Sequence, residues 1–97
     1  MNKMRPTHPG EVLREEFLEP LGLSAHALAV ALRVPAPRIN DVARERRGIT
    51  PDTALRLARF FKTTPQFWMN LQASYDLKIA LRDSRGRIEK EVLPHAA

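Results

Sequence analysis

Apolar residues recur at helical spacing along most of this 97-residue chain, and no segment alternates polar and apolar residues as a strand does. The pattern predicts five helices, at about residues 11–19, 25–32, 36–45 and 51–61 and from Pro65 onward. A chain of this length forms one small domain. The sequence therefore predicts an all-α fold with an N-terminal arm over 1–7, a folded domain over 8–82 and a flexible or partly ordered C-terminal tail over 83–97.

Capping residues mark the ends of the expected helices. Ser24, Thr50 and Thr64 each precede a predicted helix, where a side-chain oxygen accepts a hydrogen bond from a free backbone N–H group. Pro20 and Gly22 are expected to end the first helix, because proline and glycine interrupt helical structure. These residues therefore predict where the helices begin and where the first one ends.

The helical pattern weakens after residue 82. Residues 84–87 include Gly86 and are loop-like, and Pro94 argues against order near the end of the sequence. Ile88, Val92 and Leu93 are compatible with one short amphipathic turn. This weakening is the reason for the predicted tail.

Two helices joined by a tight turn are predicted between residues 25 and 44, with small or apolar residues where crossing helices touch. This spacing is typical of a helix-turn-helix motif, whose second helix enters the DNA major groove. The positions that define the spacing are Ala29, Arg33, Val34, Ile39 and Val42.

The positive charge of the chain lies on this motif and the helix after it. The whole chain has a net charge of +5, and eight basic and three acidic residues fall between Arg33 and Lys62, so the remainder is balanced. A basic face concentrated on one motif indicates a polyanionic partner. The alternative is that an arginine-rich helix only aids solubility.

The outer side of the second motif helix carries side chains that bond base edges. Arginine pairs with guanine and asparagine with adenine, and each pair contributes roughly 1–3 kcal/mol of discrimination. Capping or ion pairs within the helix are the alternative, and for Asp41 pairing with Arg38 or Arg44 competes with base contact. The candidates for base readout are Arg38, Asn40, Asp41 and Arg44.

A second set suits contacts with phosphate, which position a protein without reading sequence. Arginines occupy the turn and follow the recognition helix, and hydroxyl residues mark helix N-termini, where backbone N–H groups attract phosphate. Capping alone also explains the hydroxyls. The candidates for phosphate contact are Ser24, Arg33, Arg46, Arg47 and Thr50.

Aromatic and apolar residues in the last predicted helix suit either the core or a dimer interface. For Phe67 core packing is the stronger interpretation. The candidates for a homodimer interface are Trp68, Leu71 and Tyr75.

Several kinds of chemistry find no support in the sequence. The chain has no cysteine, and His8, His26 and His95 do not share the spacing of metal ligands. No nucleophile motif, phosphate-binding glycine loop or paired acid and base is present. No apolar run is long enough to span a bilayer, and none follows the N-terminus as in a secretion signal. We therefore expect a cytoplasmic, nucleoid-associated protein that is not an enzyme and needs no metal or cofactor.

Four segments carry a resemblance to a known family. They are His8–Leu13, Gly48–Leu57, Pro65–Gln72 and Tyr75–Leu77. Together they resemble HigA-type antitoxins, a branch of the Xre/Cro repressor-like helix-turn-helix family, over about residues 8–82. The Phe-Trp-Met-Asn-Leu-Gln block after an Ile-Thr-Pro block is much more specific than the helix-turn-helix alone.

The resemblance implies a five-helix, lambda-repressor-like domain that dimerises on a palindromic operator in double-stranded DNA. It also implies repression of its own two-gene operon and neutralisation of a HigB-type mRNA-cleaving toxin. Arg33 and Lys62 depart from it, since relatives usually have glycine at the first position and often at the second. Ala25 departs as well, because many repressor relatives place a phosphate-binding glutamine there.

Three other functions remain open on the sequence alone. A phage-type repressor without a toxin partner has the same motif. A protein-interaction module that has lost DNA binding is compatible with Ala25 and Arg33. A small ribonuclease that uses histidine and arginine is the enzymatic alternative.

Overall fold

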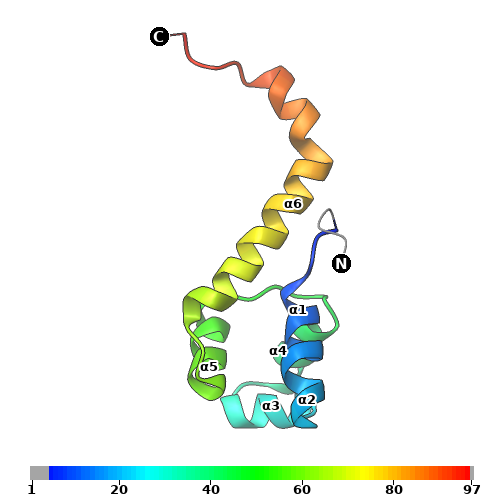
Figure 1. Ribbon diagram of the computed structural model, residues 1–97, viewed down its shortest axis with the longest axis vertical. Helices are drawn as coiled ribbons and strands as arrows, with labels where there is room; N and C mark the ends of the chain where they lie inside the picture. The colour runs from blue at the N-terminus through cyan, green and yellow to red at the C-terminus, as the bar shows by residue number, and fades with distance from the viewer. Residues whose placement is uncertain (1–4, 97) are drawn as a thin grey trace.

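The computed structural model describes residues 5–96, and within that range the chain is helical with no strand (Figure 1). The first three segments follow one another without a break, so the described chain forms five helical units, as the sequence predicts. Among these residues no helix is both long and apolar enough to cross a membrane. The segments are α1 (Pro9–Val12), the π-helical η1 (Leu13–Leu18), α2 (Glu19–Leu21), α3 (Ala25–Leu32), α4 (Ala36–Ala43), α5 (Pro51–Phe61) and α6 (Pro65–Glu91).

The first helix runs through Pro20, so the prediction that this proline ends it is wrong. A proline in a regular helix removes a hydrogen bond, and its ring clashes with the carbonyl four residues earlier. Here the preceding turns are π-helical, and the N–H of Glu19 donates to the carbonyl of Arg14, five residues back. The wider register accommodates the ring, and Gly22, at φ 62°, ends the helix instead.

The predicted capping residues are confirmed. The side chains of Ser24, Thr50 and Thr64 each accept a hydrogen bond from the backbone N–H three residues later. Arg33 and Lys62, which replace the usual glycines, are left-handed with φ of 61° and 60°. Each such non-glycine residue costs on the order of 1 kcal/mol.

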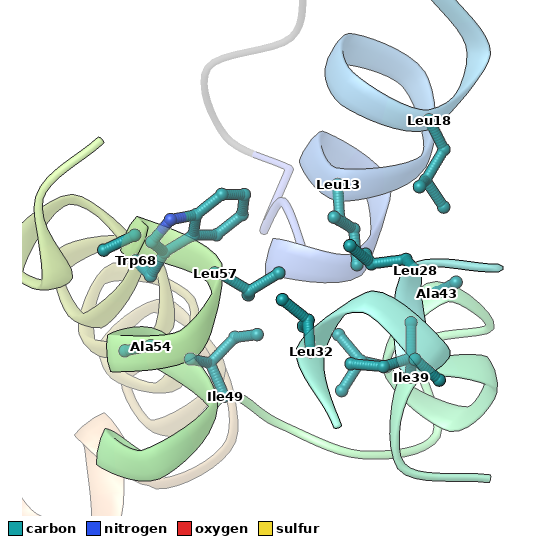
Figure 2. Close-up of a cluster of buried hydrophobic side chains, with 13 residues drawn as sticks. Leu13, Leu18, Leu28, Leu32, Ile39, Ala43, Ile49, Ala54, Leu57 and Trp68 are labelled. Atoms are coloured by element: carbon teal, nitrogen blue, oxygen red, sulfur yellow. The ribbon is translucent and has the colours of Figure 1, made fainter. Parts of the chain in front are cut away.

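The core lies where α3, α4 and α5 meet the first helix and the start of α6 (Figure 2). Its largest fully buried side chains include Leu13, Leu28, Ile39 and Leu57, one from each of four helices. Trp68 of α6 is also fully buried, and its indole N–H donates to the hydroxyl of Thr63 at 2.8 Å. The prediction that Trp68 lies at a dimer interface is therefore wrong, because its side chain is enclosed within one protomer.

Helix α6 continues well past the rest of the domain (Figure 1). The predicted loop over residues 84–87 is wrong, because these residues lie inside α6. Gly86 weakens a helix by about 1 kcal/mol, and the ion pair of Arg85 with Glu89 supports the same turn. The radius of gyration is 16.3 Å, whereas a compact chain of this length has about 13 Å.

Candidate nucleic-acid interface

Helices α3 and α4 form the helix-turn-helix that the spacing predicts. Left-handed Arg33 ends α3, and the N–H of Val34 donates to the carbonyl of Ala29 at 3.1 Å, which closes the turn. Ile39 and Val42 of α4 point inward and are fully buried. Because the buried side of α4 is apolar, its polar residues lie on the opposite side.

Two base-readout candidates lie beside the N-terminus of α3. Asn40 and Arg44 line a groove of about 530 Å³ together with Ser24 and Ala25. The Ser24 hydroxyl caps α3, so it accepts the N–H of Ala27, while Ala25 offers no polar group. The structure thus brings two readout candidates and one phosphate candidate to the same groove.

Arg38 lies in a second cleft, between α4 and the N-terminus of α5. The cleft has a volume of about 320 Å³, and Arg47 and Thr50 also line it. Arg38 is not free there, because its guanidinium donates to the carboxylate of Asp52. Hydrogen bonds from Arg56 and then from Arg38 lower the pKa of the Asp52 carboxyl below its ordinary value.

Asp41 forms a different ion pair from those the sequence suggests. Its carboxylate lies 3.9 Å from a guanidinium nitrogen of Arg47, not beside Arg38 or Arg44. This contact joins a readout candidate to a phosphate candidate. The other two phosphate candidates, Arg33 and Arg46, are exposed.

Contacts that the sequence did not reveal hold α4 against the first helix. Arg14 donates to the carbonyl of Ala43 at 2.5 Å, at the end of α4, and to the carboxylate of Glu45 at 3.2 Å. A Cβ added at Gly10 would lie 1.8 Å from the carbonyl oxygen of Val42, so the two backbones are in direct contact. Residue type and spacing do not predict either contact, because both act across about 30 residues of chain.

The segment that carries Arg46 and Arg47 is fastened to α6. Just beyond it, the N–H of Ile49 donates to the side-chain oxygen of Gln72 at 2.6 Å. The same amide packs against Gly48, where a Cβ would come within 2.8 Å of it. Through Gln72, helix α6 therefore supports the loop that follows the recognition helix.

The remaining dimer candidates are half-buried. Leu71 packs against the core. Tyr75 contacts the ring of His8 edge-on, with 4.9 Å between ring centroids. Both retain some exposed surface, so their role at an interface stays a prediction.

This geometry defines a helical protein with a DNA-binding motif, and comparison with known proteins gives its family. A helix-turn-helix family model matches residues 14–68. Virulence-associated protein I of Dichelobacter nodosus is 60% identical over 84 residues, covering 87% of this chain and 78% of the relative. Antitoxin HigA-1 of Vibrio cholerae is 37% identical over 89 residues, covering 92% and 80%.

A solved structure of the Pseudomonas aeruginosa antitoxin HigA with the higBA promoter is similar throughout. Its TM-score is 0.92 at 52% identity, with 95% of this chain and 100% of that chain covered. The chain therefore belongs to the HigA-type branch of the Xre/Cro-like helix-turn-helix family.

Proposed function

We propose that this protein is an antitoxin that binds a palindromic operator as a homodimer, represses its own operon and neutralises a HigB-type toxin. The observations that carry the proposal are the polar outer side of α4, which Arg44, Arg46 and Arg47 follow in the chain, and the promoter bound by the similar Pseudomonas aeruginosa protein. The protein acts by binding in the cytoplasm and needs no cofactor or catalytic site.

Recognition divides between two groups of side chains. Arg38, Asn40 and Arg44 read base edges in the major groove, with a smaller part for Asp41. Arg33, Arg46, Arg47 and the helix N-termini capped by Ser24 and Thr50 contact phosphates and set the register. In the dimer, two copies of α4 lie about 34 Å apart and enter successive major grooves.

The dimer interface forms on α6. Leu71 and Tyr75 contribute their exposed edges, and an apolar stripe of Leu77, Leu81 and Ile88 extends the surface. These three side chains are 62%, 48% and 47% exposed. An exposed apolar stripe at helical spacing is typical of a helix that packs against a partner.

The DNA-binding part of the proposal is tested with the promoter upstream of the chain's own gene. In a gel-shift experiment, wild-type protein is expected to bind this fragment far more tightly than shuffled DNA of equal length. Binding should weaken steeply as the salt concentration rises. Asn40→Ala should relax preference at one base pair, whereas Arg47→Ala should weaken binding to both fragments and lower the salt slope by about 1. Equal binding of wild-type protein to both fragments would contradict operator recognition.

The antitoxin part is tested by co-expression with the adjacent gene. The neighbouring product should co-purify with this chain, and its cleavage of mRNA should stop in the complex. If the neighbouring product does not bind this chain and does not cleave RNA, the result would contradict the antitoxin role and favour a repressor without a toxin partner.

A further inference from the structure

A chain of polar contacts links the recognition helix to two other helices through one carboxylate. Asp52, in the first turn of α5, accepts hydrogen bonds at the same oxygen from Arg38 of α4 at 2.5 Å and from Arg56 at 2.9 Å. Arg56 in turn donates to the carbonyl of Leu32, at the end of α3, at 2.8 Å. The network therefore spans both helices of the motif and the helix that follows.

The carboxylate of Asp52 is held in place from several sides. It lies two residues after the Thr50 cap, where the dipole of an eleven-residue helix favours negative charge. Arg56, four residues later on the same helix, anchors it, and the Leu32 carbonyl anchors Arg56. Asp52 is thus an anchored acceptor to which the side chain of Arg38 bonds.

This arrangement fixes Arg38 without using up its guanidinium. Arginine has five N–H donors in a planar fork, and only one terminal nitrogen of Arg38 bonds to Asp52. The remaining donors border the cleft that Arg47 and Thr50 also line. An unrestrained arginine loses rotamer freedom when it pairs with a base, and a restrained one has already lost it.

We propose that Asp52 is a positioning residue that orients Arg38 toward the O6 and N7 acceptors of one guanine and thereby sets operator specificity. This assignment rests on the proposed operator binding. Asp52 itself does not touch the base; it acts through the geometry of Arg38.

Simple charge neutralisation is the competing role. If Asp52 only offsets the positive charge of Arg38, its removal should tighten binding to every DNA by the same factor, because phosphate contacts are insensitive to sequence. If it positions Arg38, its removal should lower the ratio of operator to shuffled-DNA affinity. The ratio of operator affinity to shuffled-DNA affinity therefore distinguishes the two roles.

The test measures binding of full-length Asp52→Asn to the promoter fragment and to shuffled DNA at fixed salt. We expect the affinity ratio to fall on the order of tenfold, the scale of one bidentate base contact. Asp83→Asn is the matched control, because it removes the same charge from an ion pair with Arg82 in α6 and should leave the ratio unchanged. Thermal melting of each variant checks that it is folded.

Two further measurements test the role of Asp52. Asp52→Glu retains the charge but displaces the carboxylate, so it should also lower the ratio and remains informative if Asp52→Asn unfolds. A scan that replaces each promoter guanine in turn with 7-deazaguanine, which lacks the N7 acceptor, should expose one sensitive position in wild-type protein. That position should lose its sensitivity in both Asp52→Asn and Arg38→Ala.

The outcomes separate this assignment from the proposed function. Wild-type protein that does not prefer its promoter overturns operator recognition and this assignment together. A wild-type preference that persists unchanged in Asp52→Asn and Asp52→Glu overturns the role of Asp52 alone. An equal gain in affinity of Asp52→Asn for both DNA fragments would establish the neutralising role instead.

Discussion

The recognition helix α4 and the distal half of α6 are helical for opposite reasons. Helix α4 has only eight residues, including Pro37, Asn40 and Asp41, which are poor helix formers. Helix α3 and the first helix pack against it, and Arg38 bonds to Asp52 of α5. Helix α6 has 27 residues, and Trp68 is its only fully buried side chain. Tertiary contacts hold α4 in place, while local helix propensity accounts for the distal half of α6.

The two regions should therefore respond differently to the same chemical change. A substitution in α4 or its contacts removes packing that nothing else replaces. The same substitution in distal α6 changes only a solvated helix. Matched pairs of variants measure this difference directly, with stability taken from denaturant unfolding at concentrations where the protein is monomeric.

The largest expected difference is between two aliphatic truncations. Ile39→Ala empties a fully buried site in α4 and should lower the free energy of unfolding by about 2–5 kcal/mol. Leu77→Ala removes a side chain of α6 that is mostly exposed, and the free energy of unfolding of the monomer should change by about 0.5 kcal/mol or less. Similar losses for both variants would mean that distal α6 packs against the domain.

The next pair of variants should change the free energy of unfolding in opposite directions. Gly10→Ala places a Cβ against the backbone carbonyl of Val42, so it should lower the free energy of unfolding by at least about 1–3 kcal/mol through overpacking. Gly86→Ala meets no atom within 4 Å and has no positive φ, so it should raise stability by roughly 0.5–1 kcal/mol. Tolerance of Gly10→Ala would contradict the close contact between α1 and α4.

A smaller difference separates two arginines. Arg14→Ala breaks the hydrogen bonds to Ala43 and Glu45 at the end of α4, so we expect a loss of about 1–2 kcal/mol and weaker operator binding. Arg85→Ala breaks only an exposed pair with Glu89, which contributes roughly 0.3–0.5 kcal/mol. DNA binding that is unaffected by Arg14→Ala would show that α4 is held without this clamp.

The smallest expected effect is a pH dependence at His8, which joins the start of the first helix to α6. Its ring nitrogen accepts the N–H of Gly10 and caps α1, and its ring contacts Tyr75 of α6. Burial lowers the pKa of the imidazole below its ordinary 6.5, more than Glu45 and Asp76 raise it. The unfolded chain therefore takes up this proton first, so stability should fall as the pH drops below about 6.5.

His8→Asn tests this dependence, because asparagine also caps a helix but does not titrate. Its unfolding free energy should change less than that of the wild type between pH 7 and pH 5. The carboxyls of Glu11 and Asp52 act at lower pH, since arginine partners hold both pKa values below the ordinary range. An unchanged profile in His8→Asn would assign the dependence to another group.

Local signals in the sequence predict the helix starts and the motif. The hydroxyls of Ser24, Thr50 and Thr64 and the spacing around Ile39 act over a few residues, so one sequence is enough to read them. The course of the chain at Pro20 and Gly86 was not predictable in this way. A π-helical turn accommodates Pro20 within the first helix. At Gly86 the neighbouring residues favour helix strongly enough to offset the low helix propensity of one glycine.

In the candidate site, too, the sequence predicts what depends on nearby residues and does not predict what depends on distant contacts. The base and phosphate candidates come from residue type and position on α4, which the sequence shows. Arg14, Gly10 and Asp52 support α4 across 14 to 32 residues of chain, and only the folded structure brings them to it. The sequence does not place Trp68 for a related reason, since a large aromatic residue at helical spacing fits a core and an interface equally well.

Three charged residues, Arg33, Glu45 and Lys62, hold left-handed backbone where glycine would relax. Relief of backbone strain alone would favour glycine at all three positions, by roughly 1 kcal/mol at each. Glycine would also remove the turn arginine, which we propose contacts phosphate, and the acidic partner of Arg14. We therefore expect glycine at Arg33 and Glu45 to relieve backbone strain while weakening operator binding.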